Sequence, residues 1–450
     1  MSAIRTLAIG ALLLLLTSWH LDRGPNDNTL SRAALVAALI EQGTLRIDAY
    51  HEGIGDKALI DGHYYSDKAP FPALLVAPCY QVLVWSGAVH PGERGLLTDR
   101  LLMLGGFLCG SLPLALIILL CWHALRRSSP PVPRILFALL PFLGSFLFVY
   151  SGSFNAHILG AMLVLLAHIS MERQRYMLMG LACGAAVLCE YTLIVFPLIW
   201  GVMVLFRRPM EHPAPPLRSM AGIVTGAFPM VVLLLLFNYA QSGDPFSLGY
   251  DHEAHYTFMS KGYGLGLPTW ASLWGLTFSS YRGLFIYMPV LLAVVVAWAL
   301  VHRKGPAPWN DPVLLPCVLS FLLVAGYRMW WGGWAYGPRH LTTVAVLLAY
   351  RGLPLLAAQR LARWPFFVLV GIGMAEALAA KNTLWYSMPT GVRHPLSELV
   401  VPALLEGHFT NMQWPCTLGA SPAQASFGFV LVCVLAIFAL ARLDRAGARS

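Results

Sequence analysis

Residues 101–125 read LLMLGGFLCGSLPLALIILLCWHAL, an unbroken apolar run closed by Arg126 and Arg127. A helix of about 20 apolar residues is long enough to cross the hydrocarbon core of a bilayer. Comparable runs occur at 220–237 and 283–301. The chain is 58% hydrophobic and only 11% charged, whereas a soluble domain carries roughly 25% charged residues. These features predict an integral membrane protein and exclude a soluble fold.

The same pattern divides the whole chain into about twelve membrane-spanning helices, so the predicted fold class is an all-α polytopic membrane protein. The expected spans are approximately 4–19, 101–125, 134–150, 155–171, 177–190, 192–206, 218–238, 283–301, 312–328, 340–358, 364–380 and 425–442. If the chain alternates sides, the basic residues between spans fall on the cytoplasmic side, as the positive-inside rule requires. Both termini are then predicted to be cytoplasmic.

Three long segments between spans are expected on the external face, at 21–100, 239–282 and 381–424. They hold ten, three and two of the 21 acidic residues, and loops of this length are usually functional. The net charge of +9 comes largely from basic residues between spans, which indicates membrane orientation and not nucleic-acid binding.

The first external segment opens with DRGPNDNTLSR at 22–32. Pro25 and its polar neighbours predict a turn that holds Asp27 at the membrane surface. A helix over 29–42, capped by Asn28, is expected to follow and to lie at the surface. A carboxylate in this position suits a general base, and a solvated helix-capping turn is the alternative.

A second polar motif, DGHYYSDKAP at 61–70, precedes an apolar segment over 71–85. Because that segment contains two prolines, it is expected to be interfacial or re-entrant. Lys68 could hold a phosphate, and Tyr64 and Tyr65 could pack against a sugar or lipid. The alternative is an aromatic belt with a snorkelling lysine.

Polar and aromatic residues also gather at four other places in the sequence. They are Asn155 and His157 in YSGSFNAHILG; Asp251, His252, Glu253 and His255 in DHEAH; Arg282 in SYRGLFIYMP; and Trp331, Trp334, Tyr336 and Arg339 in WWGGWAYGPRH. The DHEAH string lacks the paired histidines of the helical zinc motif, so a metal site is not expected there. Tryptophans beside arginine suit sugar stacking and phosphate contact, and a membrane belt is the alternative.

Four strings in order give the chain a family resemblance: NDNTLSRAALVAALIEQGTLRID at 26–48, DGHYYSDKAP at 61–70, SYRGLFIYMPVLL at 280–292 and WWGGWAYGPRHL at 330–341. The chain resembles GT-C class membrane glycosyltransferases, the group that includes protein O-mannosyltransferases and lipid A aminoarabinose transferases. The resemblance implies transfer of a sugar from a polyprenyl-phosphate donor to a glycan, lipid or protein acceptor at the external face of the bacterial inner membrane. It also implies a GT-C-like catalytic module over 1–380, which includes the loops 21–100 and 239–282, followed by an external loop and the last span over 381–450.

The resemblance assigns roles to particular residues of this chain. Asp27 matches the catalytic base best and Asp22 is second, while Asn155 and His157 stand where relatives commonly carry another acidic residue. Lys68, in a Lys-Ala-Pro element, is expected to hold the donor phosphate. The further expected phosphate contacts are Arg32, Arg282 and Arg339, and the expected substrate contacts are Tyr64, Tyr65, Asn155, Trp331, Trp334 and Tyr336. Because phosphate is an acceptable leaving group, no metal ion or other cofactor is required.

Two other classes of function use the same surface. A transporter or flippase of a lipid-linked saccharide would need ionisable residues at mid-membrane, where the sequence offers only Glu376 and Glu190. A non-catalytic scaffold of envelope assembly would need no base at all. Loss of sugar transfer in an Asp27→Asn variant would separate an enzyme from either of them.

Overall fold

The computed structural model describes residues 3–24, 26–89, 99–207, 215–256, 258–259, 262–302, 310–359 and 363–446. Pro25, which the sequence places in the turn before Asp27, lies outside these ranges. The chain forms two compact units. Unit 1 comprises Met1–Leu21, Ser111–Ser151 and Pro268–Ser450, and unit 2 comprises Asp22–Gly110 and Gly152–Leu267.

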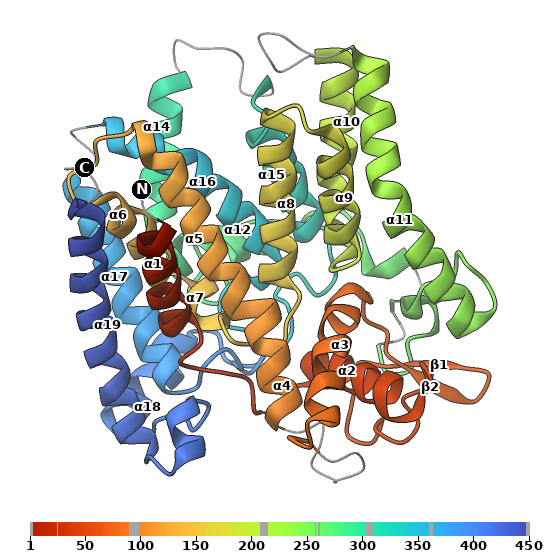
Figure 1. The fold of residues 1–450 in the computed structure, drawn as a ribbon. Helices are drawn as coiled ribbons and strands as arrows, with labels where there is room; N and C mark the ends of the chain where they lie inside the picture. The colour runs from red at the N-terminus through yellow and green to blue at the C-terminus, as the bar shows by residue number, and fades with distance from the viewer. Residues whose placement is uncertain are drawn as a thin grey trace. The chain divides into compact units, whose positions relative to one another are not determined.

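In the described residues of unit 1, the regular elements are all helices (Figure 1). Its α-helices are α1 (Ala3–Thr17), α5 (Leu112–Ala124), α6 (Arg134–Leu143), α7 (Phe146–Tyr150), α12 (Trp270–Thr277), α13 (Leu284–Tyr287), α14 (Val290–His302), α15 (Leu314–Ala325), α16 (Thr342–Ala358), α17 (Arg363–Asn382), α18 (Val401–Leu405) and α19 (Pro422–Ala446). A single helical turn, η9 (Arg339–Leu341), leads into α16. Thr17 and Ser111 exchange hydrogen bonds with each other's backbone carbonyls and so join α1 to the start of α5.

Unit 2 combines helices with one small hairpin, and Figure 1 shows that hairpin near α2 and α3. Its α-helices are α2 (Asp27–Ala37), α3 (Phe71–Trp85), α4 (Asp99–Gly106), α8 (His157–Glu172), α9 (Tyr176–Val187), α10 (Val195–Val202) and α11 (Pro216–Ser242). A π-helical turn, η1 (Ala38–Gln42), extends α2, and short 3-10 turns form η4 (Tyr191–Ile194) and η6 (Gly249–His252). Strands β1 (Ala58–Ile60) and β2 (His63–Tyr65) pair antiparallel, with Leu59 opposite Tyr64.

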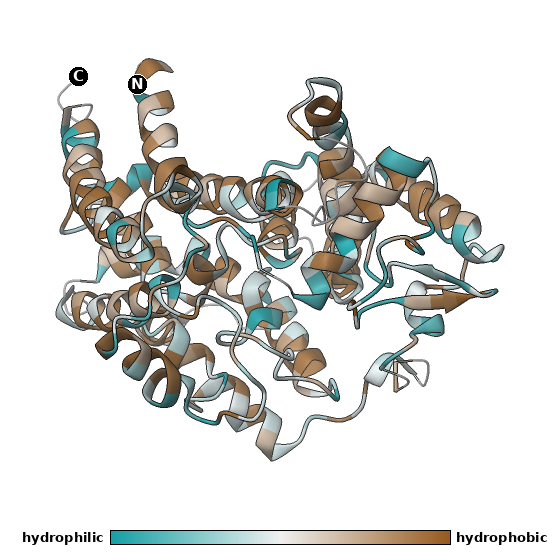
Figure 2. Cartoon of the chain, turned by 90° about the horizontal axis from the view of Figure 1, so that it is seen from below, coloured by the Kyte–Doolittle hydropathy of each residue, from teal (hydrophilic) through white to brown (hydrophobic). Residues whose placement is uncertain are grey.

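Every predicted span coincides with a helix or with a helix broken by a turn. In the described residues, five helical stretches are long and apolar enough to cross a membrane, namely Asp99–Arg127, Pro216–Ser242, Arg339–Ala358, Trp364–Asn382 and Pro422–Ala446. Most of the helical ribbon in Figure 2 is hydrophobic, and hydrophilic colour gathers in the connections. These stretches confirm a multi-pass membrane protein by length and composition, while the number twelve and the orientation stay predictions.

The helix expected after the first polar turn differs from the prediction in detail. The helix expected over 29–42 begins at Asp27, and its cap is Asn26, whose side chain accepts a hydrogen bond from the Asn28 backbone N–H. The cap at Asn28 was therefore wrong. Most of its residues from Thr29 onward are buried within unit 2, while the expected place of the helix at the membrane surface stays a prediction. Alanines on several of its sides allow this close packing.

Small residues bring two helices of unit 2 into direct backbone contact. Gly180 and Gly184 lie four apart on α9, and Gly222 and Gly226 lie four apart on α11. A methyl group added at Gly180 would meet the carbonyl oxygen of Ile223, and one added at Gly226 would meet that of Met177. This reciprocal arrangement is the small-xxx-small packing that is common between membrane helices.

Candidate functional site

The carboxylate of Asp27 stands at the first position of α2, in the turn that Asn26 caps. The helix N-terminus favours a negative charge there. Behind the carboxylate lies Gly55, which has no side chain, and a Cβ added at that position would be 2.7 Å from Asp27 Oδ2. Asp27 itself is only partly buried. It is thus an accessible carboxylate that occupies the space a side chain at Gly55 would need.

Arg32 follows one turn later on the same helix and is 4% exposed. Its guanidinium donates to the side-chain oxygen of Asn28 at 2.9 Å and to the Asn28 carbonyl at 3.2 Å. The Nε–H is buried and finds no acceptor in the described part of the chain. A buried arginine with a donor left over is well suited to hold an additional oxyanion.

Lys68, just after the hairpin, is paired with two carboxylates. Its Nζ lies 2.7 Å from Asp67 Oδ2 and 2.9 Å from Asp56 Oδ2, and it stands 5.6 Å from the centre of the Tyr250 ring. Burial disfavours the charged amine, but the two carboxylates outweigh burial and hold the pKa of Lys68 well above its ordinary value. Lys68 is therefore a permanent cation whose charge is already compensated.

Asp67 is also hydrogen-bonded to Glu253, which comes from the distant segment after α11. Asp67 is 2% exposed and Glu253 is 7% exposed. Burial raises the pKa of Glu253, and the neighbouring Asp67 raises it further, to about 8. Burial likewise raises the pKa of Asp67, although Lys68 opposes the rise. Ser31 of α2 donates to Asp67 Oδ1 at 3.3 Å, which links this pair to the helix that carries Asp27.

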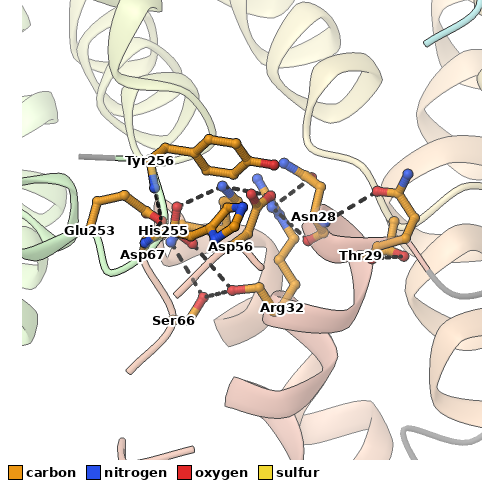
Figure 3. A network of polar contacts seen from close by, with 12 residues as sticks. Asn28, Thr29, Arg32, Asp56, Ser66, Asp67, Glu253, His255 and Tyr256 are labelled. Carbon is orange, nitrogen blue, oxygen red and sulfur yellow. Dashed lines mark hydrogen bonds and ion pairs between the residues drawn. The ribbon is translucent and has the colours of Figure 1, made fainter. Parts of the chain in front are cut away.

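Tyr256 lies between the two parts of this network. Figure 3 shows its ring extending from the Glu253 side toward Asn28. The charges of Asp27, Asp56 and Lys68 all act on its hydroxyl. Asp27, Arg32 and Lys68, which the sequence predicted as site residues, are therefore brought together in unit 2.

The other polar residues predicted near the outer end of the first helix have structural partners. Asp22 is fully buried, and its carboxylate accepts from the backbone N–H groups of Gly24 and Phe154. His157 Nδ1 lies 2.7 Å from Glu190 Oε1. Asn155 donates to Ser153 Oγ at 3.2 Å, and its side-chain oxygen is buried with no donor in the described residues. Asp22 thus ties two backbone segments together.

The two tyrosines of the hairpin pack into its own small cores. Tyr64 stacks on His51 with ring centres 4.0 Å apart and contacts the cluster of Ala34 and Ile47. Tyr65 is buried with Ala58 and Ile60, and its hydroxyl accepts from Arg46 at 3.4 Å. Both rings hold the hairpin against neighbouring segments.

In unit 1, Arg282 organises the tryptophan-bearing turn. Its side chain is fully buried. It donates from Nε to the carbonyl of Trp331 at 3.0 Å, from Nη1 to that of Tyr281 at 2.8 Å, and from Nη2 to those of Gly333 and Met388 at 3.3 and 3.5 Å. These four bonds leave at most one of its five N–H groups free. Arg282 therefore holds these backbone segments in place.

The remaining predicted residues of this turn differ in exposure. Trp334 is 56% exposed, whereas Tyr336 is buried and meets the Tyr287 ring edge-on at 4.7 Å. The backbone N–H of Tyr336 donates to the Tyr150 hydroxyl. The Nε–H of Arg339 and the indole N–H of Trp331 are buried without an acceptor in the described residues. That Arg339 shares one cavity with Asp27 and Lys68 stays a prediction.

The DHEAH residues do not converge on one point. Asp251 accepts the Leu248 N–H, His252 bonds Ser247 Oγ at 2.8 Å, and Glu253 faces Asp67. The exposed His255 ring packs against Tyr256. The side chains have four different partners.

Sequence reasoning missed Asp56 and Asp67 as partners of Lys68 and Glu253 as the partner of Asp67, and it missed Gly55 and Tyr256 altogether. The spacing within DGHYYSDKAP gives no sign that a glutamate almost 190 residues away completes the cluster. A glycine such as Gly55 permits a close backbone approach, but the sequence does not show what approaches it. That approach could be recognised only once the fold was known.

Comparisons with known proteins concern the fold. No family model and no curated protein matches the chain in sequence. ArnT from Cupriavidus metallidurans, solved bound to undecaprenyl phosphate, is 12% identical with a TM-score of 0.46 over 98% of this chain and 77% of ArnT. The archaeal oligosaccharyltransferase AglB from Archaeoglobus fulgidus, in complex with an inhibitory peptide and a dolichol-phosphate, is 12% identical with a TM-score of 0.43 over 99% of this chain and 56% of AglB. Both structures are GT-C membrane glycosyltransferases, the class that the sequence motifs resemble.

Proposed function

We propose that this chain transfers a sugar from a polyprenyl-phosphate donor to a hydroxyl of a glycan, lipid or protein acceptor at the external face of the bacterial inner membrane. The observation that carries the proposal is the grouping in unit 2 of an accessible carboxylate, Asp27, with Arg32 and the Lys68 cluster, on a chain with apolar helices long enough to cross a bilayer. The family resemblance of the motifs around these residues supplies the reaction class.

In the proposed reaction, Asp27 removes the proton from the acceptor hydroxyl. The oxygen attacks the anomeric carbon, a new C–O bond forms, and the bond from that carbon to the phosphate oxygen breaks. The polyprenyl phosphate leaves with the electron pair of the broken bond, and the proton stays on Asp27 until it is lost to water. A positioned base of this kind contributes about 10²–10⁴ in rate.

The leaving phosphate needs a cation with hydrogen-bond donors to spare. Arg32 is held by the neutral oxygens of Asn28 and keeps an unused Nε–H, whereas Lys68 is held by two carboxylates. A guanidinium also matches the geometry of phosphate oxygens. Arg32 is thus the principal phosphate ligand in this proposal, with Lys68 adding positive charge nearby. Arg339 and the exposed Trp334 are proposed to contact the donor from the tryptophan turn.

The proposal is tested in a bacterial strain that lacks the gene. Mass spectrometry of envelope glycans, lipids and glycoproteins should reveal a sugar that disappears on deletion and returns when the wild-type gene is supplied. An Asp27→Asn gene should not restore it, although the protein reaches the membrane at normal levels. An Asp27→Asn gene that restores the sugar fully would refute the assignment of the base.

A flippase of a lipid-linked saccharide is the second candidate, because Glu376 lies within the possible span Trp364–Asn382 and its Oε2 is buried without a partner in the described residues. Ionisable groups inside spans are typical of transport pathways. A flippase would translocate the lipid in reconstituted vesicles, and this activity would depend on Glu376 and not on Asp27.

A further inference from the structure

The segment 249–256 is seated on the hairpin and its flanks by backbone contacts. Glu253 forms a β-bridge with Ala58, and the N–H of Ala254 donates to the carbonyl of Lys57 at 2.9 Å. Gly249 lies so close to Asp67 that a Cβ there would be 2.9 Å from the Asp67 Cα. The segment thus joins two parts of the chain far apart in sequence at the Lys68 cluster.

Two acidic side chains meet at the centre of this seat. Asp67 and Glu253 are hydrogen-bonded to each other and both are buried. Two ionised carboxylates have no hydrogen to share, so one of them must carry a proton for that bond to exist. The Glu253 carboxyl also accepts from the backbone N–H groups of His255 and Tyr256, which fixes its orientation toward Asp67.

The surrounding charges set how strongly this proton is held. Asp67 and Lys68 face Glu253 from the residues after β2, Asp56 stands next to Lys68 from the residues before β1, and Tyr256 belongs to the same segment as Glu253. Lys68 supplies one positive charge against the carboxylates of Asp56 and Asp67, so ionisation of Glu253 would add a further negative charge with no cation to balance it. The cluster therefore holds one proton between Asp67 and Glu253.

We propose that this shared proton fastens segment 249–256 onto the hairpin, so that the segment is released from the Lys68 cluster as the external pH becomes alkaline. Tyr256 moves with the segment, which would uncover the space between Asn28 and Glu253. The consequence for access to Asp27 rests on the proposed function, but the fastening itself does not.

The direction of the pH dependence follows from the pKa of Glu253. Seating raises that pKa from 4.5 to about 8, so the seated form binds more protons than the released form between these values. Seating is then strongest below the lower value, weakens as the pH rises and levels off above the upper one. The equilibrium between seated and released forms changes by up to about tenfold per pH unit within the window.

Hydrogen exchange of the full-length protein in detergent micelles measures this release. The peptide covering 249–256 is followed from about pH 5 to about pH 9, and each value is divided by that of a Glu253→Gln protein at the same pH, which cancels the intrinsic pH dependence of exchange. Glutamine can donate to Asp67 at any pH. The relative protection of the wild-type segment should fall by at least about tenfold across the window and then stay constant.

Two further variants keep the result decisive. Asp67→Asn also supplies a permanent hydrogen-bond donor and should behave as Glu253→Gln does, while Glu52→Gln, an exposed acid of the same unit, should follow the wild type. A constant ratio over the whole range would overturn the proposal. So would loss of protection at every pH in both amide variants, because a permanent donor should keep the segment seated. None of these readouts depends on sugar transfer.

Discussion

Lys68 in unit 2 and Arg282 in unit 1 are both buried cations that the sequence assigned to the donor phosphate, yet the fold surrounds them differently. Lys68 is enclosed by carboxylates at 2.7 and 2.9 Å. Arg282 is enclosed by four backbone carbonyls. A compact ammonium is compensated by charge, whereas a planar guanidinium with five donors can hold several backbone segments at once.

This difference shows which basic residues remain available for a ligand. Neither Lys68 nor Arg282 has much unused capacity. Arg32 and Arg339 each keep a buried Nε–H without an acceptor in the described residues. The cations most suited to bind phosphate are therefore the two whose donors the fold does not fully use.

The largest expected effect on stability comes from replacing Arg282, whose guanidinium donates to four backbone carbonyls. Arg282→Leu removes four hydrogen bonds and leaves three carbonyls without a donor in the described residues, because the Met388 carbonyl keeps the N–H of Ala335. At about 1–3 kcal/mol for each stranded carbonyl, the protein should lose roughly 6 kcal/mol of stability. Thermal unfolding of the purified protein measures it. Arg393→Gln is the matched control, since this exposed arginine stacks on the same Tyr281 ring. Equal stability of the two variants would show that the hydrogen bonds of Arg282 do not stabilise the fold.

The second-largest effect on stability is expected from removing the Lys68 side chain. Lys68→Met leaves Asp56 and Asp67 without their cation, which is expected to cost about 3–5 kcal/mol. Adding Asp56→Asn to that variant removes one of the two stranded charges and should recover a measurable part of the loss. Strictly additive losses in thermal unfolding would show that Lys68 and Asp56 do not interact.

A smaller effect is expected from Gly55→Ala, and it should fall on activity. The new methyl group would displace the flexible Asp27 carboxylate, from which it would be 2.7 Å away in the present arrangement. A displaced base should lower sugar transfer about 10- to 100-fold while the unfolding temperature stays nearly constant. Gly391→Ala, at an exposed position with open space around it, is the control. Normal transfer in Gly55→Ala would mean that the position of Asp27 is not critical.

The smallest effect is expected at the pair of Arg23 and Asp99. The two side chains are 2.8 Å apart but 21% and 53% exposed, and exposed pairs contribute about 0–1 kcal/mol. Asp99→Asn should therefore shift thermal unfolding only slightly at low salt and not at all at high salt. A loss as large as that of Lys68→Met would show that exposure does not separate these two ion pairs.

Much of the helical organisation could be predicted because apolar runs of this length have few alternatives. The sequence places Glu190 between two expected spans, and α9 does end at Val187 before a new helical turn begins at Tyr191. The cap of α2 was misassigned by two residues because Asn26 and Asn28 are both good cap residues. Composition cannot choose between them without the backbone angles.

The site could be predicted only where its residues are close in sequence. Asp27 and Arg32 share one helix, so their proximity follows from helical spacing. Glu253 reaches Asp67 through a long-range contact that no local pattern encodes. Tyr64 and Tyr65 look like substrate contacts in the sequence, yet they fill the hairpin cores. Exposed and buried aromatic residues have the same sequence signature.

The most direct test of the account is the turnover of a purified Asp27→Asn protein, with undecaprenyl phosphate binding measured in the same preparation. The donor is the lipid extract of the deletion strain, and product is detected by mass spectrometry. The account predicts that turnover falls at least about 100-fold while undecaprenyl phosphate binds as it does to the wild type, because Arg32 and Lys68 are unchanged. Turnover equal to that of the wild type would contradict the central claim.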